Sequence, residues 1–321
     1  MLQPKPLFAE RIRTLLGNEA ERFFDYCSKP SPDCIRANKI KISPSELFKN
    51  LSKIWQVLQP FHQYPEIMKV VSKLDGSPLG PGELGKTKEH LLGYYYVQGL
   101  SSMMPVIALA PNEKESVLDL CASPGSKTTQ LAAEMKNSGM LIANDNDLSR
   151  IIVLNSNLER CGVTNCIVTR EDGARLCEKF SQLGIQLDKI LVDTSCSGEG
   201  VIRENPKTLE MWNYKMIQNF SRQQKRLAAS AFSLLKEGGE MVYSTCTLAP
   251  EENEEVVQFL LDKFNAEIEE IKLPIKTREG IGSWQGKEFS KEIKKCCRIY
   301  PQDNDSEGFF VAKIKKLGNK N

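Results

Sequence analysis

The chain of 321 residues is 40% hydrophobic and 26% charged, proportions typical of a globular protein and unlike those of a disordered or fibrous one. No apolar run approaches the roughly 18 residues that a membrane helix needs, and the N-terminal residues contain no hydrophobic signal core. We therefore expect a cytoplasmic protein without membrane spans. The formal net charge of +2 does not by itself indicate a nucleic-acid binder.

The ten cysteines include no Cys-x-x-Cys pair, and neither of the two histidines, His62 and His90, lies beside a cysteine pair. We therefore expect reduced thiols and no structural metal. The scarcity of histidine also argues against Ser-His-Asp and Cys-His hydrolases, because both need a histidine base. Nothing in the sequence indicates an oligomer, so a monomer is the default expectation.

Residues 1 to about 110 are expected to form a small α+β extension of helices and a short basic strand, interrupted by prolines. The stretch 35–41 alternates apolar and polar residues, as a half-buried strand does. This region holds 14 Lys and Arg against 10 Asp and Glu. That modest excess fits a solvated surface almost as well as a phosphate-binding one.

From residue 116 onward, short apolar runs alternate with helical patterns. The expected strands are 117–120, 141–145, 167–169, 189–193, 241–244 and 309–314, and the expected helices are 127–135, 148–160, 220–235 and 251–264. Strands separated by helices predict a largely parallel sheet covered on both faces, with ligands at the carboxyl ends of the strands. The chain should thus divide into an extension, 1–110, and an α/β domain, 111–321.

A loop of small residues follows the first of these strands and opens a helix. It consists of Cys121, Ala122, Ser123, Pro124, Gly125, Ser126 and Lys127. Small residues allow a ligand close to the backbone, and the start of the helix offers free N–H groups. The spacing matches neither the dinucleotide nor the phosphate-loop glycine pattern, so a ligand with a sulfonium and a carboxylate fits better than a pyrophosphate. A plain strand-to-helix turn is an equal alternative.

Two acids at strand ends are candidates for holding a nucleoside cofactor. Asp145 ends the second strand, about 20 residues after the glycine-bearing loop, where a carboxylate typically accepts from ribose hydroxyls. Asp147 is a competitor that the strand register disfavours. Asp172 follows the third strand and is a candidate partner for an adenine amino group, although a helix N-cap explains it nearly as well.

Two cysteines also lie where strands are expected to end. Cys196 stands three residues after Asp193, and Cys246 follows the strand 241–244. Their neighbours are small and polar, whereas a structural cysteine is usually a small hydrophobic group in the core. These two thiols are therefore candidates for chemistry.

Together these motifs resemble those of the Sun/Nop/Nol family of RNA cytosine-5 methyltransferases. The matching segments are 117–128, 193–206, 243–246 and 250–254, with 35–38, 93–98 and 308–313, and the resemblance extends over about residues 30–315. It implies a class I, Rossmann-like methyltransferase domain with a mostly parallel seven-stranded sheet. It also implies S-adenosyl-L-methionine as cofactor and an N-terminal extension that contacts RNA.

The resemblance implies roles for individual residues as well. Cys246 would add to carbon 6 of a cytosine and so activate carbon 5 for methylation, and Cys196 would assist release of the product. The residues alone do not rank these two thiols. Asp193 would hold the edge of the base, and Lys127 would contact the base or Asp193. Arg150 resembles a position near the cofactor, and a surface arginine is an equal alternative.

Candidate RNA contacts are basic residues on the expected strand and after the Cys196 loop. They are Arg36, Lys39, Lys41 and Arg203, with Lys207 as a further candidate. The tyrosines at 94–96 offer a stacking face, although we expect at least one of them in the core. Compact size favours transfer RNA over ribosomal RNA. A catalytically idle RNA-binding assembly factor and a DNA cytosine methyltransferase are weaker alternatives.

The chain departs from the family pattern without losing a catalytic group. Ser195 replaces the usual proline before Cys196, and Gly99 replaces the usual acid after Gln98. Loss of the proline frees an N–H group and a backbone dihedral angle, so we expect a less rigid loop beside Cys196.

Overall fold

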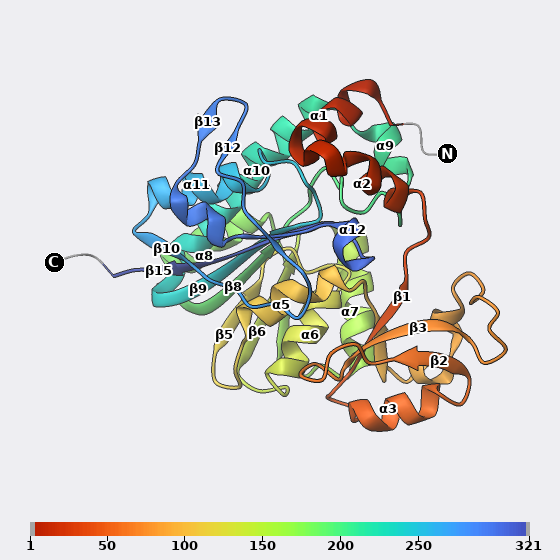
Figure 1. The fold of residues 1–321 in the computed structure, drawn as a ribbon. Coiled ribbons are helices and arrows are strands. Elements are labelled where there is room, and N and C mark those ends of the chain that lie inside the picture. Colours follow the sequence, from red (N-terminus) through yellow and green to blue (C-terminus); the bar gives the residue numbers. More distant parts are fainter. Residues whose placement is uncertain (1–3, 319–321) are drawn as a thin grey trace.

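The computed structural model describes residues 4–318, and Figure 1 shows its fold. Residues 1–3, which belong to the segment inspected for an export signal, and residues 319–321 lie outside the described part. The helices are α1 (Pro6–Leu16), α2 (Ala20–Cys27), α3 (Pro44–Leu51), α4 (Lys88–Leu91), α5 (Met104–Leu109), α6 (Ser126–Glu134), α7 (Leu148–Cys161), α8 (Gly173–Gln182), α9 (Lys207–Met211), α10 (Tyr214–Ser233), α11 (Glu254–Lys263) and α12 (Pro301–Asn304). The strands are β1 (Asp33–Ala37), β2 (Trp55–Leu58), β3 (Ile67–Lys73), β4 (Tyr95–Val97), β5 (Ser116–Asp119), β6 (Met140–Asp145), β7 (Cys166–Arg170), β8 (Leu187–Asp193), β9 (Leu235–Thr245), β10 (Ala266–Glu269), β11 (Arg278–Glu279), β12 (Ser283–Trp284), β13 (Lys287–Glu288), β14 (Cys297–Ile299) and β15 (Phe309–Lys316).

A nine-stranded sheet forms the centre of the molecule, with the order β11-β14-β15-β9-β8-β5-β6-β7 and with β10 paired to β15. The strands β5 to β9 run parallel, and β10, β11, β14 and β15 join in antiparallel pairs. The sheet is therefore the expected Rossmann-like one but more mixed and larger than the seven strands predicted. The difference arises because the segment between α11 and β14 adds the short strands β10 and β11.

Helices cover both faces of this sheet (Figure 1). On one face, α8, α10 and α11 pack on the strands through a buried cluster that includes Leu176, Phe232 and Leu260. On the other face, α5 and α6 contribute Val106 and Leu131 to a second cluster. Because both faces are covered, the accessible place for a ligand is the edge where β5, β6, β8 and β9 end.

Some observed bounds differ from the predicted ones. Helix α10 begins at Tyr214 rather than at residue 220, because the side chain of Asn213 accepts the N–H of Met216 and caps the first turn. Gly238 and Gly239, which follow the predicted helix 220–235 in the sequence, lie within β9. Among residues 4–318, no helix combines the length and the apolar character that crossing a membrane requires.

The N-terminal region contains a four-stranded antiparallel sheet with the order β2-β3-β1-β4. Its strand β1 ends before Asn38 rather than at residue 41. The reason is that the side-chain amide of Asn38 donates to the carbonyl oxygens of Gly93 and Cys161, at 2.8 and 2.7 Å, and turns the chain. Lys39 and Lys41 consequently lie in the turn that follows β1.

The first two helices pack away from this small sheet (Figure 1). Phe8, Ile12 and Phe23 of α1 and α2 are buried together with Trp212 and Ile217 of the α/β part. The two helices are therefore anchored on the α/β part, although the sequence groups them with the small sheet in one extension.

Arg36 joins the two parts from the inside. It is 3% exposed, and its guanidinium donates to the backbone oxygen of Ser126 and the hydroxyl of Thr129, both at 2.8 Å, and to the side chain of Gln98. A guanidinium bonded in this way is not available to a phosphate group. The expectation that Arg36 contacts RNA is therefore wrong.

Replacing Arg36 by Met should destabilise the protein, because its buried acceptors then lose their donor. We expect the free energy of unfolding, measured by urea titration, to fall by about 2 to 4 kcal/mol. Lys53→Met, at an exposed lysine, is the control and should change it by less than about 0.5 kcal/mol. If Arg36→Met left the stability unchanged and weakened RNA binding, Arg36 would be an RNA contact after all.

Candidate active site

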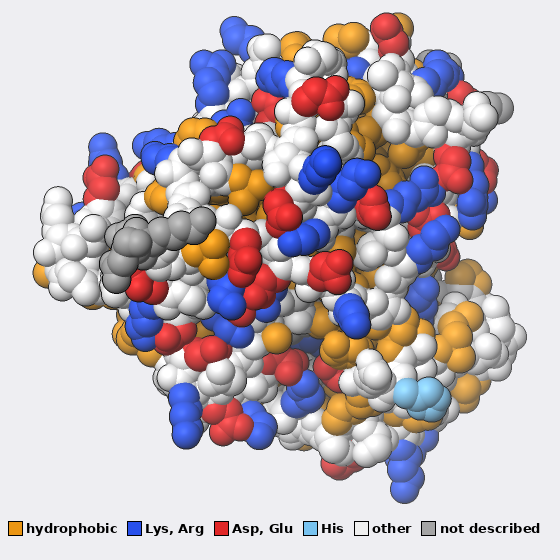
Figure 2. Space-filling model, turned by 60° about the vertical axis from the view of Figure 1, so that its left-hand side comes forward, with side chains coloured by type: hydrophobic (Ala, Val, Ile, Leu, Met, Phe, Trp, Pro, Cys, Tyr) orange, Lys and Arg blue, Asp and Glu red, His pale blue; other side chains and the backbone are white. Residues whose placement is uncertain are grey.

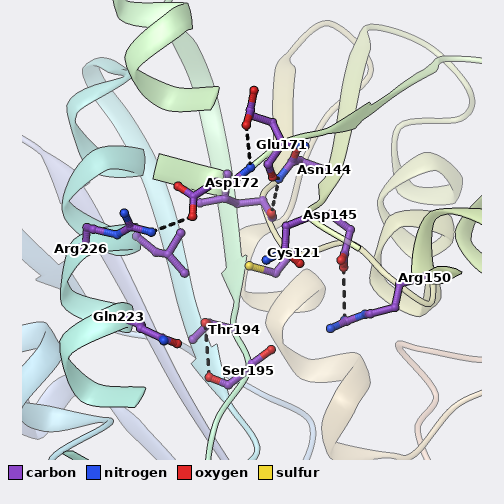
Figure 3. A pocket seen from close by; sticks show the side chains of 14 residues that line it. Cys121, Asn144, Asp145, Arg150, Glu171, Asp172, Thr194, Ser195, Gln223 and Arg226 are labelled. Carbon is purple, nitrogen blue, oxygen red and sulfur yellow. Dashed lines mark hydrogen bonds and ion pairs between the residues drawn. The ribbon is translucent and has the colours of Figure 1, made fainter. Parts of the chain in front are cut away.

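Two pockets adjoin at the carboxyl ends of the parallel strands. The first is shown in Figure 3, and its wall includes Asn144, Asp145, Arg150, Asp172, Gln223 and Arg226. The second includes Ser102, Asp119, Lys127, Asp193, Cys246 and Phe309. Cys121 and Thr194 belong to both walls, so molecules that occupy the two pockets lie next to each other.

The loop predicted to bind a cofactor stands between the pockets. Of its residues, Cys121 lines both pockets, and Ala122, Ser123, Pro124, Ser126 and Lys127 line the second. Gly125 supports the turn instead: its φ is 104°, and a Cβ there would lie 3.1 Å from the side chain of Leu154. Burial raises the pKa of the Cys121 thiol, which therefore forms a neutral part of the wall.

Asp145 brings a carboxylate to the first pocket at the end of β6 (Figure 3). Its Oδ2 lies 3.2 Å from the guanidinium of Arg150 and accepts the N–H of Ser123 at 3.3 Å. Arg150 also donates to the backbone oxygen of Ser123 at 3.0 Å, so it ties the loop to this acid. The competitor, Asp147, accepts the N–H of Arg150 at 3.0 Å and caps α7. The geometry thus favours Asp145 as the acid of this pocket.

Asp172 lines the same pocket, but both of its carboxylate oxygens already have partners. Oδ1 accepts the N–H of Arg175 at 3.1 Å and caps α8, and Oδ2 pairs with Arg226 at 2.7 Å (Figure 3). Asp172 therefore caps a helix, as the alternative interpretation of the sequence predicts. A ligand that contacts Asp172 has to share one of these oxygens.

The sulfur atoms of Cys196 and Cys246 lie 3.0 Å apart. They meet because β8 and β9 are neighbouring parallel strands, which place the two following loops side by side. Cys246 lines the second pocket, and Cys196 lies directly beside it. The hydrogen bond to Cys246, together with burial, raises the pKa of Cys196 well above its usual value. Cys196 therefore keeps its proton.

A fixed ion pair lines the pocket with Cys246. The ammonium of Lys127 lies 2.7 Å from Oδ2 of Asp193 and donates to the hydroxyl of Ser102 at 3.0 Å. The other oxygen of Asp193 accepts from the hydroxyl of Ser244 at 2.7 Å. The side chain of Lys127 is only 8% exposed. The pocket therefore presents one anionic acceptor and one cationic donor in set positions.

Two residues that the sequence analysis does not single out hold the Cys196 loop. Gln224 donates to the backbone oxygen of Ser195 at 3.0 Å and to Oε2 of Glu252 at 2.8 Å, and that oxygen also accepts the N–H of Ser197 at 3.1 Å. Burial raises the pKa of Glu252 to about 8. The loop is thus hydrogen-bonded on both sides of Cys196 although Ser195 replaces a proline. A glutamine on the buried face of α10 is the signal that would have indicated this support.

Arg203, another predicted RNA contact, is buried. It is 9% exposed and donates to the backbone oxygen of Pro30 at 2.6 Å and to the carboxylate of Asp305 at 2.9 Å. These bonds tie the segment before β1 to the loop that follows Cys196. The expectation of a phosphate contact at Arg203 is therefore wrong for the same reason as at Arg36.

Lys39 and Lys41 remain near the surface, where Lys39 pairs with Glu66 and Glu134. On the face shown in Figure 2, Lys and Arg alternate with Asp and Glu and do not gather into a continuous basic patch. Tyr95 is fully buried, which confirms core packing for one of the three tyrosines. In the described part of the chain, no group of three or more His, Cys, Asp or Glu side chains is arranged to hold a metal ion.

Comparison with protein families assigns both parts of the chain. Residues 106–315 match the family described as 16S rRNA methyltransferase RsmB/F, and residues 5–99 match the N-terminal domain of 16S rRNA methyltransferase RsmF. A tRNA (cytosine(49)-C(5))-methyltransferase of Pyrococcus abyssi is 41% identical over 301 residues, which cover 93% of each chain. A ribosomal RNA small subunit methyltransferase F of Vibrio vulnificus is 39% identical over 98% of this chain, which spans 64% of that protein's length.

Solved structures agree with this grouping. A methyltransferase homologue from Pyrococcus horikoshii has a TM-score of 0.85 and 36% identity, and the match covers 98% of this chain and 96% of the other. NSun6 from Pyrococcus horikoshii, solved with SFG, has a TM-score of 0.82 and 26% identity over 98% of this chain and 99% of its own. The chain therefore belongs to the RsmB/F family of methyltransferases, the Sun/Nop family whose motifs its sequence carries.

Proposed function

We propose that this protein is an S-adenosylmethionine-dependent tRNA (cytosine-5)-methyltransferase that acts through a covalent bond between Cys246 and the base. The observation that carries the proposal is the 3.0 Å approach of the sulfur atoms of Cys196 and Cys246. Cys246 shares its pocket with the pair of Lys127 and Asp193, and a second pocket adjoins it. Two thiols, a polar base-holding pair and a neighbouring cofactor pocket are the parts that this reaction needs.

The residues present fit S-adenosylmethionine. Asp145 offers a carboxylate to ribose hydroxyls in the first pocket. In the second pocket, Oδ1 of Asp119 is buried and has no hydrogen-bond partner within residues 4–318, and an amino group of the cofactor would satisfy it. Burial raises the pKa of Asp119 to about 7. When bound, the cofactor supplies a methyl group on a sulfonium.

The chain's own groups account for the remaining chemistry. The thiolate of Cys246 forms a bond to carbon 6 of a flipped cytosine, and the displaced electron pair makes carbon 5 nucleophilic. After carbon 5 has taken the methyl group, its proton leaves to a base. The 5,6 double bond then re-forms as the bond from carbon 6 to sulfur breaks. Asp193 and Lys127 hold the polar edge of the ring, and Cys196 assists the release.

The geometry supports this order of the two thiols, which the sequence alone leaves open. Cys246 lines the pocket, as an attacking atom must. The raised pKa of Cys196 keeps that thiol protonated, so it is not the thiolate of the resting site. A protonated Cys196, 3.0 Å away, is able to donate to a thiolate at Cys246 when that thiolate forms.

Transfer RNA is the substrate that the comparisons favour. The match to the tRNA (cytosine(49)-C(5))-methyltransferase of Pyrococcus abyssi covers 93% of both chains. The match to the ribosomal RNA methyltransferase of Vibrio vulnificus covers only 64% of that enzyme's length. The predicted basic contacts that are exposed are Lys39, Lys41 and Lys207, and we retain these three as RNA contacts. The ammonium of Lys41 already donates to the backbone oxygens of Leu92 and Arg160, at 3.0 and 2.7 Å, so only its remaining N–H bond is available to a phosphate group. We expect the protein to act as a monomer in the cytoplasm.

The direct test is methylation of a transfer RNA transcript with tritiated S-adenosylmethionine, followed by bisulfite sequencing of the product. We expect one protected cytosine, and Cys246→Ala should lower the initial rate by more than about 1000-fold because the nucleophile is lost. Cys166→Ala removes a thiol that lines neither pocket and should remain active. Full activity of Cys246→Ala would refute the covalent route. If only ribosomal RNA were labelled, the substrate would be ribosomal RNA and not transfer RNA.

Cys196→Ala should trap the reaction after methylation, because release from Cys246 then lacks its assisting group. We expect a protein–RNA band that survives denaturing electrophoresis and accumulates with time, while the first turnover stays close to the wild-type rate. A normal steady-state rate without such a band contradicts the release role.

Asp145→Ala should weaken cofactor binding by about 10- to 100-fold, since a charge-assisted hydrogen bond in the first pocket is lost. Isothermal titration calorimetry with S-adenosylhomocysteine measures this change, and RNA affinity serves as the control because Asp145 lies in the other pocket. An unchanged cofactor affinity would show that Asp145 does not bind the cofactor.

A further inference from the structure

A second carboxyl group lines the pocket of Cys246. Glu307 stands just before β15, and Ser101 holds it at two points. The N–H of Ser101 donates to Oε2 of Glu307 at 3.1 Å, and the hydroxyl of Ser101 donates to the backbone oxygen of Glu307 at 2.8 Å. Within residues 4–318, no hydrogen bond to another residue uses Oε1. One oxygen of this carboxyl group is thus fixed, and the other is bonded to no other residue of the described part.

The carboxyl group of Glu307 occupies this position because Gly99 has no side chain. A Cβ at Gly99 would lie 1.3 Å from Oε1 and 2.3 Å from Cδ of Glu307, so any side chain there would displace the carboxyl group. Gly99 does not adopt a positive φ, so its backbone conformation does not require glycine. Glycine at position 99 therefore matters because it leaves room for the carboxyl group of Glu307.

Glu307 lies on the same wall as the base-holding pair. Ser102, the next residue after Ser101, accepts a hydrogen bond from Lys127, which in turn pairs with Asp193. Lys127, Asp193 and Glu307 thus line the same pocket. Burial and the nearby carboxylate of Glu204 raise the pKa of Glu307. In its ionised form the carboxyl group has only acceptor oxygens and no donor.

We propose that Glu307 is a specificity-determining residue that accepts one hydrogen bond from the exocyclic 4-amino group of the target cytosine. This inference rests on the proposed function. An amino group carries two N–H bonds, and we assign one to Asp193 and the other to Glu307, since both line the pocket of Cys246. Uracil has a carbonyl oxygen at the same position, which would leave two acceptors facing each other without a proton between them. Glu307 thus selects cytosine over uracil.

The test compares two RNAs that differ in one base. A transfer RNA transcript, mapped by bisulfite sequencing, is made with cytosine or uracil at the methylated position, and both affinities are measured with S-adenosylhomocysteine present. We expect wild-type protein to prefer cytosine by about tenfold or more. Glu307→Gln keeps an oxygen for the N–H of Ser101 but turns an amide N–H₂ toward the base, so the preference should fall at least about fivefold.

Gly99→Ala provides an independent route to the same result, because the new methyl group displaces the carboxyl group without changing Glu307. Its matched control is Gly85→Ala, where a Cβ meets nothing within 4 Å and the preference should stay at the wild-type value. Thermal melts of each variant report on folding. If both Glu307→Gln and Gly99→Ala retain the wild-type preference, Glu307 is only a support for Ser101 and the inference is overturned. Methylation by the wild-type protein is measured in parallel, and its absence would overturn the proposed function as well.

Discussion

Neighbouring parallel strands deliver the loops that follow them to one edge of a sheet, and the whole site depends on that constraint. Strands β8 and β9 are paired in register from Leu191 to Asp193 against Val242 to Ser244. Cys196 and Cys246 follow these strands at nearly equal distances, so their sulfur atoms meet although 50 positions separate them in the chain. Neither thiol would find the other if the strands were not adjacent and parallel.

The approach of the two thiols is useful only because the surrounding groups are held still. Glu252 and Gln224 fix the Cys196 loop through two hydrogen bonds and are bonded to each other by a third. Lys127 and Ser244 fix the carboxylate of Asp193. Preorganised donors and acceptors of this kind need little rearrangement when charge develops on a base. The cost of burial is visible in the pKa of Glu252, which is raised to about 8.

Sequence patterns predicted the parts of this molecule that depend on local periodicity or on strand ends. The parallel core, the loop of residues 121–127 and the position of both cysteines at strand ends follow from short apolar runs separated by helices. The failures concern side chains whose partners lie far away in the chain. Arg36 and Arg203 are basic residues in a proposed RNA-binding enzyme, yet distant backbone oxygens and side chains bind both inside the protein.

Small departures in the sequence were also interpretable only in three dimensions. Ser195 in place of proline suggested a looser loop, but Gln224, from a helix far along the chain, binds its carbonyl oxygen. Gly99 looked like the loss of an acid, and the structure places the carboxyl group of Glu307 in the space beside it. In both cases the compensating residue comes from another element, and no local pattern marks it.

The central claim is that Cys246, and not its neighbour, bonds to the base. RNA that carries 5-fluorocytosine at the modified position tests it most directly. A base removes the proton at carbon 5 of cytosine but cannot remove fluorine from that carbon, so the covalent adduct persists. Nuclease and protease digestion followed by mass spectrometry then identifies the peptide joined to the nucleotide. We predict the peptide that contains Cys246; attachment to Cys196, or to neither cysteine, would contradict the account.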